Sequence, residues 1–177
     1  MDRERLEAEL AELPIVQYAF FETEELTFTD RVRYVCEHEC PQYGRSWACP
    51  PAVGTVDECV ARCRSYPHAL LITTMAEVSD IADMEATLAT RAGHEAVTRQ
   101  VHRFMRDQGT EPLVLSTESC AVCGTCSYPD GPCRRPELMY PCVESQGILV
   151  TDIAQRLGIE FQAGNNIVTW FSLLLYR

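Results

Sequence analysis

Two short cysteine-rich segments constrain this chain more than any other feature of its sequence. The chain has ten cysteines in 177 residues: Cys36, Cys40, Cys49, Cys59, Cys63, Cys120, Cys123, Cys126, Cys133 and Cys142. The charged, helix-like start has no apolar leader, so we expect a cytoplasmic protein, in which thiols stay reduced. Clustered cysteines in that compartment more often bind metal than form disulfides.

The second segment, residues 120–136, has the more specific spacing. Two residues separate Cys120 from Cys123 and Cys123 from Cys126, and six residues precede Cys133. A loop of this kind wraps a cubane and presents three thiolates to three irons, while a fourth comes from further along the chain, as in bacterial ferredoxins. Structural zinc more often uses two separated Cys-x2-Cys pairs. The spacing therefore predicts a [4Fe–4S] cluster, with zinc as the alternative.

The first segment, residues 36–54, carries only three thiols. Its ligand candidates are Cys36, Cys40 and Cys49. The spacing of three residues and then eight is not that of a zinc finger. A fourth ligand could be Cys59, Cys63 or Cys142, could come from outside the protein, or could be absent. An iron without a fourth protein ligand would be open to a substrate, which is a route from electron storage to chemistry.

The remaining cysteines are less suggestive of metal. Cys59 and Cys63 lie four residues apart on the apolar face of a predicted helix, where both fit as small core residues. The alternative is that Cys63 is a cluster ligand. Cys142 follows Pro141 near a helix start and is interpreted as a bystander or a supporting thiol.

Other polar and aromatic residues flank the two segments. His38 lies between two cysteines, but its glutamate neighbours favour an exposed turn over a ligand role. Tyr43 and Trp47 either shield the first site from water or pack in the core. His94 and His102, eight residues apart, are expected to be surface or partly buried residues of one helix. Three arginines near the clusters either neutralise cluster charge or lie in solvent: Arg45, Arg134 and Arg135.

Charge narrows the function classes. All 15 basic residues are arginine, against 26 acidic residues, which gives a net charge of −11. The absence of lysine excludes a Schiff-base lysine, an internal pyridoxal-phosphate aldimine and a P-loop lysine. The acidic balance argues against nucleic-acid binding and suits a redox protein that docks on a basic partner surface. No apolar run is long enough to span a membrane.

The hydrophobic pattern predicts one layered domain over residues 1–177, of the α/β or α+β class, with helices packed on a mixed sheet and the cysteine loops at strand ends. A helix is expected at 1–14, ended by Pro14, and one or two strands within 15–35. The further expected helices are 55–65, 80–90, 92–107 and 151–157, and the further strands are 68–75, 112–117 and 166–176.

Taken together, the two segments resemble a cysteine-rich family of predicted metal-binding proteins of unknown function. The resemblance runs from about Arg31 to the C-terminus. It is carried by Cys36-x3-Cys40-Pro41-x-Tyr43-Gly44-x2-Trp47-x-Cys49-Pro50-Pro51, by Cys120-x2-Cys123-x2-Cys126-x6-Cys133-Arg134-x-Pro136-Glu137, and by Val143-Glu144-Ser145-Gln146-Gly147-Ile148. It implies that the seven cysteines of the first two motifs are metal ligands, that the metal is iron–sulfur, and that such proteins serve anaerobic lifestyles. The resemblance also implies that the family usually has serine at the position of Cys142, which argues against a general ligand role for that residue.

The sequence thus predicts an iron–sulfur protein with one or two [4Fe–4S] clusters that moves single electrons. One alternative is an iron–sulfur reductase or lyase with an open iron at the first segment. The other is a zinc-stabilised interaction domain. The expected partner is a redox protein or a small-molecule substrate, not nucleic acid or a membrane.

Overall fold

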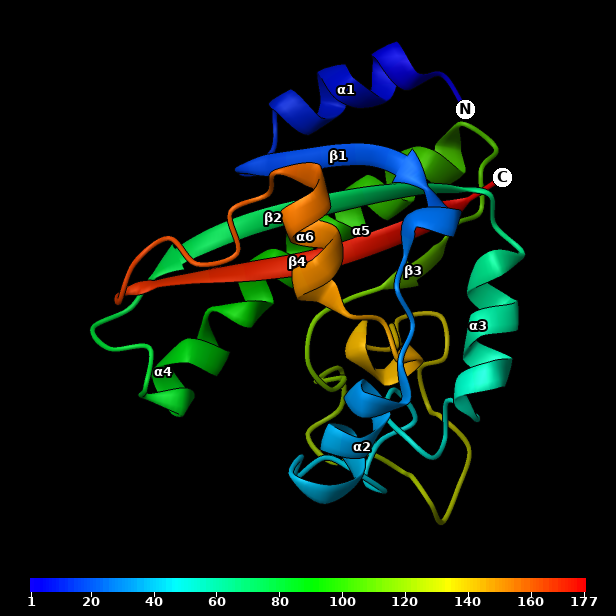
Figure 1. Ribbon diagram of the computed structural model, residues 1–177, viewed down its shortest axis with the longest axis vertical. Helices are drawn as coiled ribbons and strands as arrows, with labels where there is room; N and C mark the ends of the chain where they lie inside the picture. Colours follow the sequence, from blue (N-terminus) through cyan, green and yellow to red (C-terminus); the bar gives the residue numbers. More distant parts are fainter.

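Four strands, all paired antiparallel, form the sheet on which the fold is built (Figure 1). The computed structural model describes residues 1–177. The strand order is β1-β2-β4-β3, and the strands are β1 (Gln17–Glu22), β2 (His68–Glu77), β3 (Leu113–Leu115) and β4 (Ile167–Tyr176). The expected α+β class is therefore confirmed. The expected mixed sheet is wrong, since every pair is antiparallel.

The two central strands are apolar because both of their faces are covered. β2 and β4 pair over their whole length, from His68 opposite Tyr176 to Glu77 opposite Ile167. The side chains of residues 69–74 are all buried, with no inside–outside alternation. A continuous apolar run is what a strand needs when helices lie on both sides of it.

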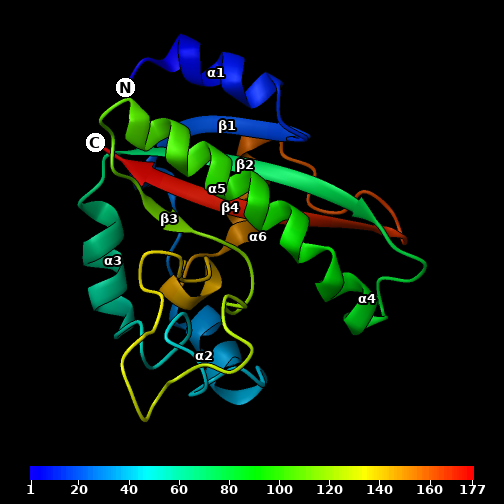
Figure 2. The ribbon, with the colours of Figure 1, turned by 180° about the vertical axis from the view of Figure 1, so that it is seen from behind.

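Two hydrophobic cores lie on opposite faces of the sheet. On one face α1 (Arg3–Ala11) and α5 (Arg91–Asp107) pack against the sheet, with Leu6 and Met105 fully buried (Figure 2). On the other face α6 (Val150–Leu157) packs through Ile153, and α3 (Val56–Arg64) adds Cys63. The short α4 (Met84–Ala89) precedes α5. None of these helices is long and apolar enough to cross a membrane.

Local signals in the sequence correctly predict several boundaries. Thr55 caps α3 in a reciprocal capping box: the Glu58 N–H donates to the Thr55 hydroxyl at 3.2 Å, and the Thr55 N–H donates to the Glu58 carboxylate at 2.8 Å. α6 ends at Gly158, whose φ of +66° is the left-handed conformation typical of a residue that ends a helix.

The expectation of strands throughout 15–35 is wrong in its second half. β1 ends at Glu22, a 3-10 turn (Thr23–Glu25) follows, and α2 then runs from Asp30 to His38. Thr29 starts this helix, since its hydroxyl accepts the Arg31 N–H at 3.3 Å. Cys36 therefore lies in the last turn of a helix and not in a loop.

The cysteine segments gather beyond β3, the strand at one edge of the sheet. Figures 1 and 2 show α2 and the loops after it beside the loop that follows β3, all on this side of the molecule. Backbone hydrogen bonds join three segments there. The Ser116 N–H donates to the Pro141 carbonyl at 2.9 Å, the Val143 N–H donates to the Ser116 carbonyl at 2.9 Å, and the Cys142 N–H donates to the Ala48 carbonyl at 3.4 Å. Segments far apart in the sequence thus meet at one place.

A buried histidine anchors α5 to the sheet, which corrects the surface or partly buried position expected for it. His94 is 1% exposed. Its Nδ1 lies 2.9 Å from the Thr74 hydroxyl and its Nε2 lies 2.8 Å from the Ser172 hydroxyl, so both ring nitrogens have partners on the central strands. Burial lowers the pKa of His94 to about 4. His102, by contrast, is only partly buried, and its Nδ1 lies 2.7 Å from the Tyr140 hydroxyl.

This pKa predicts a loss of stability on mild acidification. The unfolded chain protonates His94 below pH 6.5, whereas the folded chain resists protonation down to about pH 4, so stability falls as the pH drops through this window. Between pH 7.5 and pH 5 the histidine should cost about 2 kcal/mol. Urea unfolding at pH 7.5 and at pH 5 measures this loss of stability. His94→Asn should lose this part of the pH dependence, whereas His68→Asn, which alters an exposed histidine, should keep it.

Candidate metal centres

Eight of the ten cysteines line two pockets, four in each. We call these the first and second thiol pockets. The first thiol pocket contains Cys36, Cys40, Cys49 and Cys142. The second thiol pocket contains Cys120, Cys123, Cys126 and Cys133. All ten cysteines are free thiols. No group of three or more His, Cys, Asp or Glu side chains converges closely enough to hold a single metal ion.

The first thiol pocket is a cavity of about 260 Å³ built by three segments. Cys36 comes from the last turn of α2 and Cys40 from the residues just after it. Cys49 comes from the turn after Ser46, whose carbonyl accepts the Cys49 N–H at 3.2 Å. Cys142 comes from the segment before the 3-10 turn Glu144–Gln146. The pocket is thus assembled by tertiary structure from residues distant in the sequence.

Cys142 was expected to be a bystander or supporting thiol, but the structure places its side chain against Cys49. The nearby Cys142 thiol lowers the pKa of Cys49 to about 7. The same interaction between the two thiols, together with burial, raises the pKa of Cys142 well above its usual range. The Ser145 N–H also donates to the Cys142 sulfur at 3.2 Å. The pair therefore offers a thiolate at Cys49 near neutral pH, the form that binds metal.

Charged groups surround the first thiol pocket. Glu118 and Glu144 line it, together with the uncharged Ser119. Burial, with Cys40 and Glu144 as further causes, raises the pKa of Cys36 to about 11. That thiol keeps its proton until a metal displaces it, as is usual for thiol ligands. The spacing of the cysteines alone gave no signal for Glu118 or Glu144.

Arg33 holds the walls of the first thiol pocket together. It is only 8% exposed. Its guanidinium donates to the Gly54 carbonyl and to the Ser145 carbonyl, both at 2.8 Å, and so ties α2 to the segments before α3 and after Cys142. It was not singled out from the sequence, because nothing local distinguishes it from the arginines that lie in solvent.

The second thiol pocket is a small space of about 20 Å³ inside the loop after β3. Between residues 120 and 134 the only backbone–backbone hydrogen bond runs from the Gly131 N–H to the Ser127 carbonyl, at 2.9 Å. Burial raises the pKa of Cys120. Two side-chain hydrogen bonds also lie within the loop, from Ser127 to the Pro132 carbonyl and from Arg134 to the Thr125 carbonyl. Four thiols on a loop with so little regular structure fit a group that binds them all.

Trp47 belongs to the second thiol pocket, although its sequence position suggested the first. Its indole N–H donates to the Gly131 carbonyl at 3.0 Å, and its ring meets Tyr128 edge-on with centroids 5.0 Å apart. Tyr43 does line the first thiol pocket. Arg134 and Arg135 line the second, whereas Arg45 is exposed and lines neither.

The other candidates line neither pocket. His38 is exposed and stacks on Tyr34, with its Nδ1 2.9 Å from the Tyr34 carbonyl. Cys59 and Cys63 are fully buried on α3, as expected for core residues. Burial raises the pKa of Cys63 to about 12, so this thiol stays protonated. Neither lines the first thiol pocket, so the structure does not supply them as its fourth ligand.

Comparison with known proteins agrees with a metal role. A family model described as a predicted metal-binding protein (DUF2284) matches residues 19–176. The chain belongs to this family. No curated protein and no solved structure matches it. The DUF2284 match spans both thiol pockets and nearly the whole sheet, so the metal-binding description applies to the domain as a unit.

Proposed function

We propose that this protein binds two iron–sulfur clusters, one in each thiol pocket, and transfers single electrons between partners. The observation that carries the proposal is the grouping of eight cysteines into two neighbouring sets of four. Four cysteine thiolates are the usual ligand set of a [4Fe–4S] cluster, which supplies one-electron chemistry when bound.

The second thiol pocket carries the stronger argument for iron. The Cys-x2-Cys-x2-Cys spacing from Cys120 to Cys126 is that of ferredoxin loops, and Cys133 reaches the same space. Arg134 and Arg135 line this pocket and would offset the negative charge of a cluster bound by four thiolates. The Trp47 indole covers the loop and limits access of water.

The first thiol pocket supports a closed site and not an open iron. With Cys142 beside Cys49, four protein thiols line the cavity. We therefore favour electron transfer over the reductase or lyase alternative at this pocket, because a fully ligated iron leaves no position for a substrate. A set of four cysteine ligands also suits structural zinc, which would make the chain an interaction domain without redox chemistry.

The two pockets are adjacent, which suits a relay. Ser119 lines the first pocket and the next residue, Cys120, lines the second. Trp47 lines the second pocket, and Cys49, two residues on, lines the first. Two short chain segments thus form the wall between the pockets. Clusters held on either side of that wall would exchange electrons directly.

Magnetic resonance tests this function. After anaerobic purification and reduction with dithionite, we expect two paramagnetic centres close enough to couple, so the EPR signal should be broadened by their interaction. Cys40→Ser, which removes one ligand from the first pocket, should leave the narrower signal of an isolated second centre. Reduced protein with neither an EPR signal nor bleaching of visible absorbance would contradict the proposal.

A further inference from the structure

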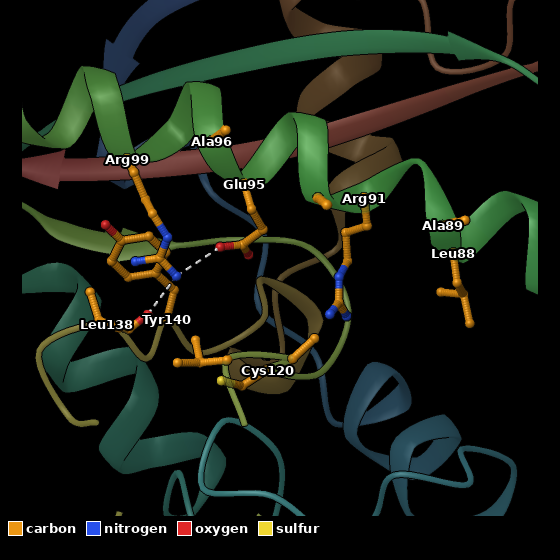
Figure 3. Close-up of a pocket in the computed structure, with 12 residues that line it drawn as sticks. Leu88, Ala89, Arg91, Glu95, Ala96, Arg99, Cys120, Leu138 and Tyr140 are labelled. Carbon is orange, nitrogen blue, oxygen red and sulfur yellow. Dashed lines mark hydrogen bonds and ion pairs between the residues drawn. The ribbon is translucent and has the colours of Figure 1, made fainter. Parts of the chain in front are cut away.

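A large cavity lies beside the second thiol pocket, between α5 and the loop after β3. Its volume is about 560 Å³, within the usual range for small-molecule sites. The side chains that give it an apolar surface include Leu88, Val122, Leu138 and Tyr140, and the alanines of α5 leave it wide. Figure 3 shows Cys120 at the end of the cavity away from α5. A molecule in this cavity would therefore lie against the second thiol pocket.

Two arginines enter the cavity from α5, and they differ in their partners. Arg99 is engaged: its guanidinium lies 3.2 Å from the Glu95 carboxylate, donates to the Leu138 carbonyl at 2.7 Å, and lies 4.7 Å from the centre of the Tyr140 ring (Figure 3). Its charge is compensated within the cavity wall. Arg99 and Glu95 thus complete the wall, and their ion pair leaves Arg99 without the uncompensated charge that would attract an anion.

Arg91 is a cation without an acidic partner. One of its nitrogens donates to the Ser119 carbonyl, and it forms no ion pair. Figure 3 shows its side chain extending from α5 toward the loop that carries Cys120. A guanidinium has five N–H donors, so most of those on Arg91 remain available. In a chain with a net charge of −11, this is a local site for an anion.

We propose that this cavity binds a small organic carboxylate with an apolar body, with its carboxylate on Arg91 and its body between α5 and Leu138. The mostly apolar lining favours the body, and the unpaired guanidinium favours a planar anion that it can bind through two parallel hydrogen bonds. A small-molecule ligand at this cavity goes beyond the electron transfer proposed above. It does not depend on which metal the thiol pockets hold.

Calorimetric titration with 2-naphthoate, and with the uncharged 2-naphthamide as its matched control, tests the proposal on the anaerobically purified full chain. We expect 2-naphthoate to bind with a dissociation constant below about 1 mM, and the amide at least about tenfold more weakly. Arg91→Gln should weaken 2-naphthoate binding about tenfold or more and leave the amide unchanged. Ala96→Trp fills the cavity from an exposed position on α5 and should abolish both.

Arg103→Gln provides the control, because Arg103 is exposed on the same helix but does not line the cavity. It should bind both compounds like the natural chain. Three results would each overturn the proposal: no binding of 2-naphthoate by the natural chain, equal binding of acid and amide, or unchanged binding in Ala96→Trp. Iron analysis of the same samples tests the electron-transfer proposal separately, so failure of ligand binding and failure of cluster binding can be told apart.

Discussion

Cys123→Ser should remove the second centre and much of the stability of the folded protein. The loop between residues 120 and 134 has one backbone–backbone hydrogen bond and two side-chain hydrogen bonds of its own, so bound metal would contribute most of what holds it closed. Metal-linked folding energies are large, and we expect the loss to be on the order of several kcal/mol. Iron content should fall to about half that of the natural chain if each pocket holds one [4Fe–4S] cluster. Metal analysis and thermal unfolding measure the two effects.

Cys59→Ala is the matched control for this change. Cys59 is fully buried on α3 and lines neither thiol pocket, so its loss should leave the metal content unchanged. It should cost about 1 kcal/mol through the small cavity it creates. If Cys59→Ala lost iron while Cys123→Ser kept it, the division between ligand and core cysteines would be wrong.

Cys142→Ala should open the first centre to added ligands. In the natural chain, four thiols surround that pocket, and cyanide or a small thiol should leave the EPR spectrum of the reduced protein unchanged. In the variant, one iron loses its protein ligand, so the same additions should change the spectrum. The second centre should persist, because Cys142 does not line its pocket.

Two outcomes would remove Cys142 from the ligand set. One is a natural chain that already responds to cyanide, which would restore the open-iron enzyme as the better description. The other is a variant that stays unresponsive with full iron content. Cys63→Ala serves as the control, because Cys63 is buried in the core against the sheet and its loss should not change the response.

The sequence predicts those parts of the fold that local signals determine. The capping residues Thr55 and Glu58 mark the start of α3, and Gly158 marks the end of α6. The long apolar runs of β2 and β4 identify the central strands. The second thiol pocket was also predictable, since all four of its cysteines lie on one loop and their spacing carries the information.

The errors of the sequence-based predictions arise where tertiary contacts determine the structure. Residues 30–38 contain Val and Tyr, which favour strands, yet the Thr29 cap and burial of Arg33 make them helical. The backbone bond from the Cys142 N–H to the Ala48 carbonyl brings Cys142 to the segment that carries Cys49, and no spacing rule relates such distant residues. His94 is buried because Thr74 and Ser172 satisfy its ring nitrogens, which the pattern of one helix does not show.

Iron and acid-labile sulfide analysis of the anaerobically purified chain tests the central claim most directly. Two [4Fe–4S] clusters require about eight iron and about eight sulfide per chain, with a brown colour from thiolate-to-iron charge transfer. Colourless protein with stoichiometric zinc and no labile sulfide would contradict the account and make the thiol pockets structural zinc sites.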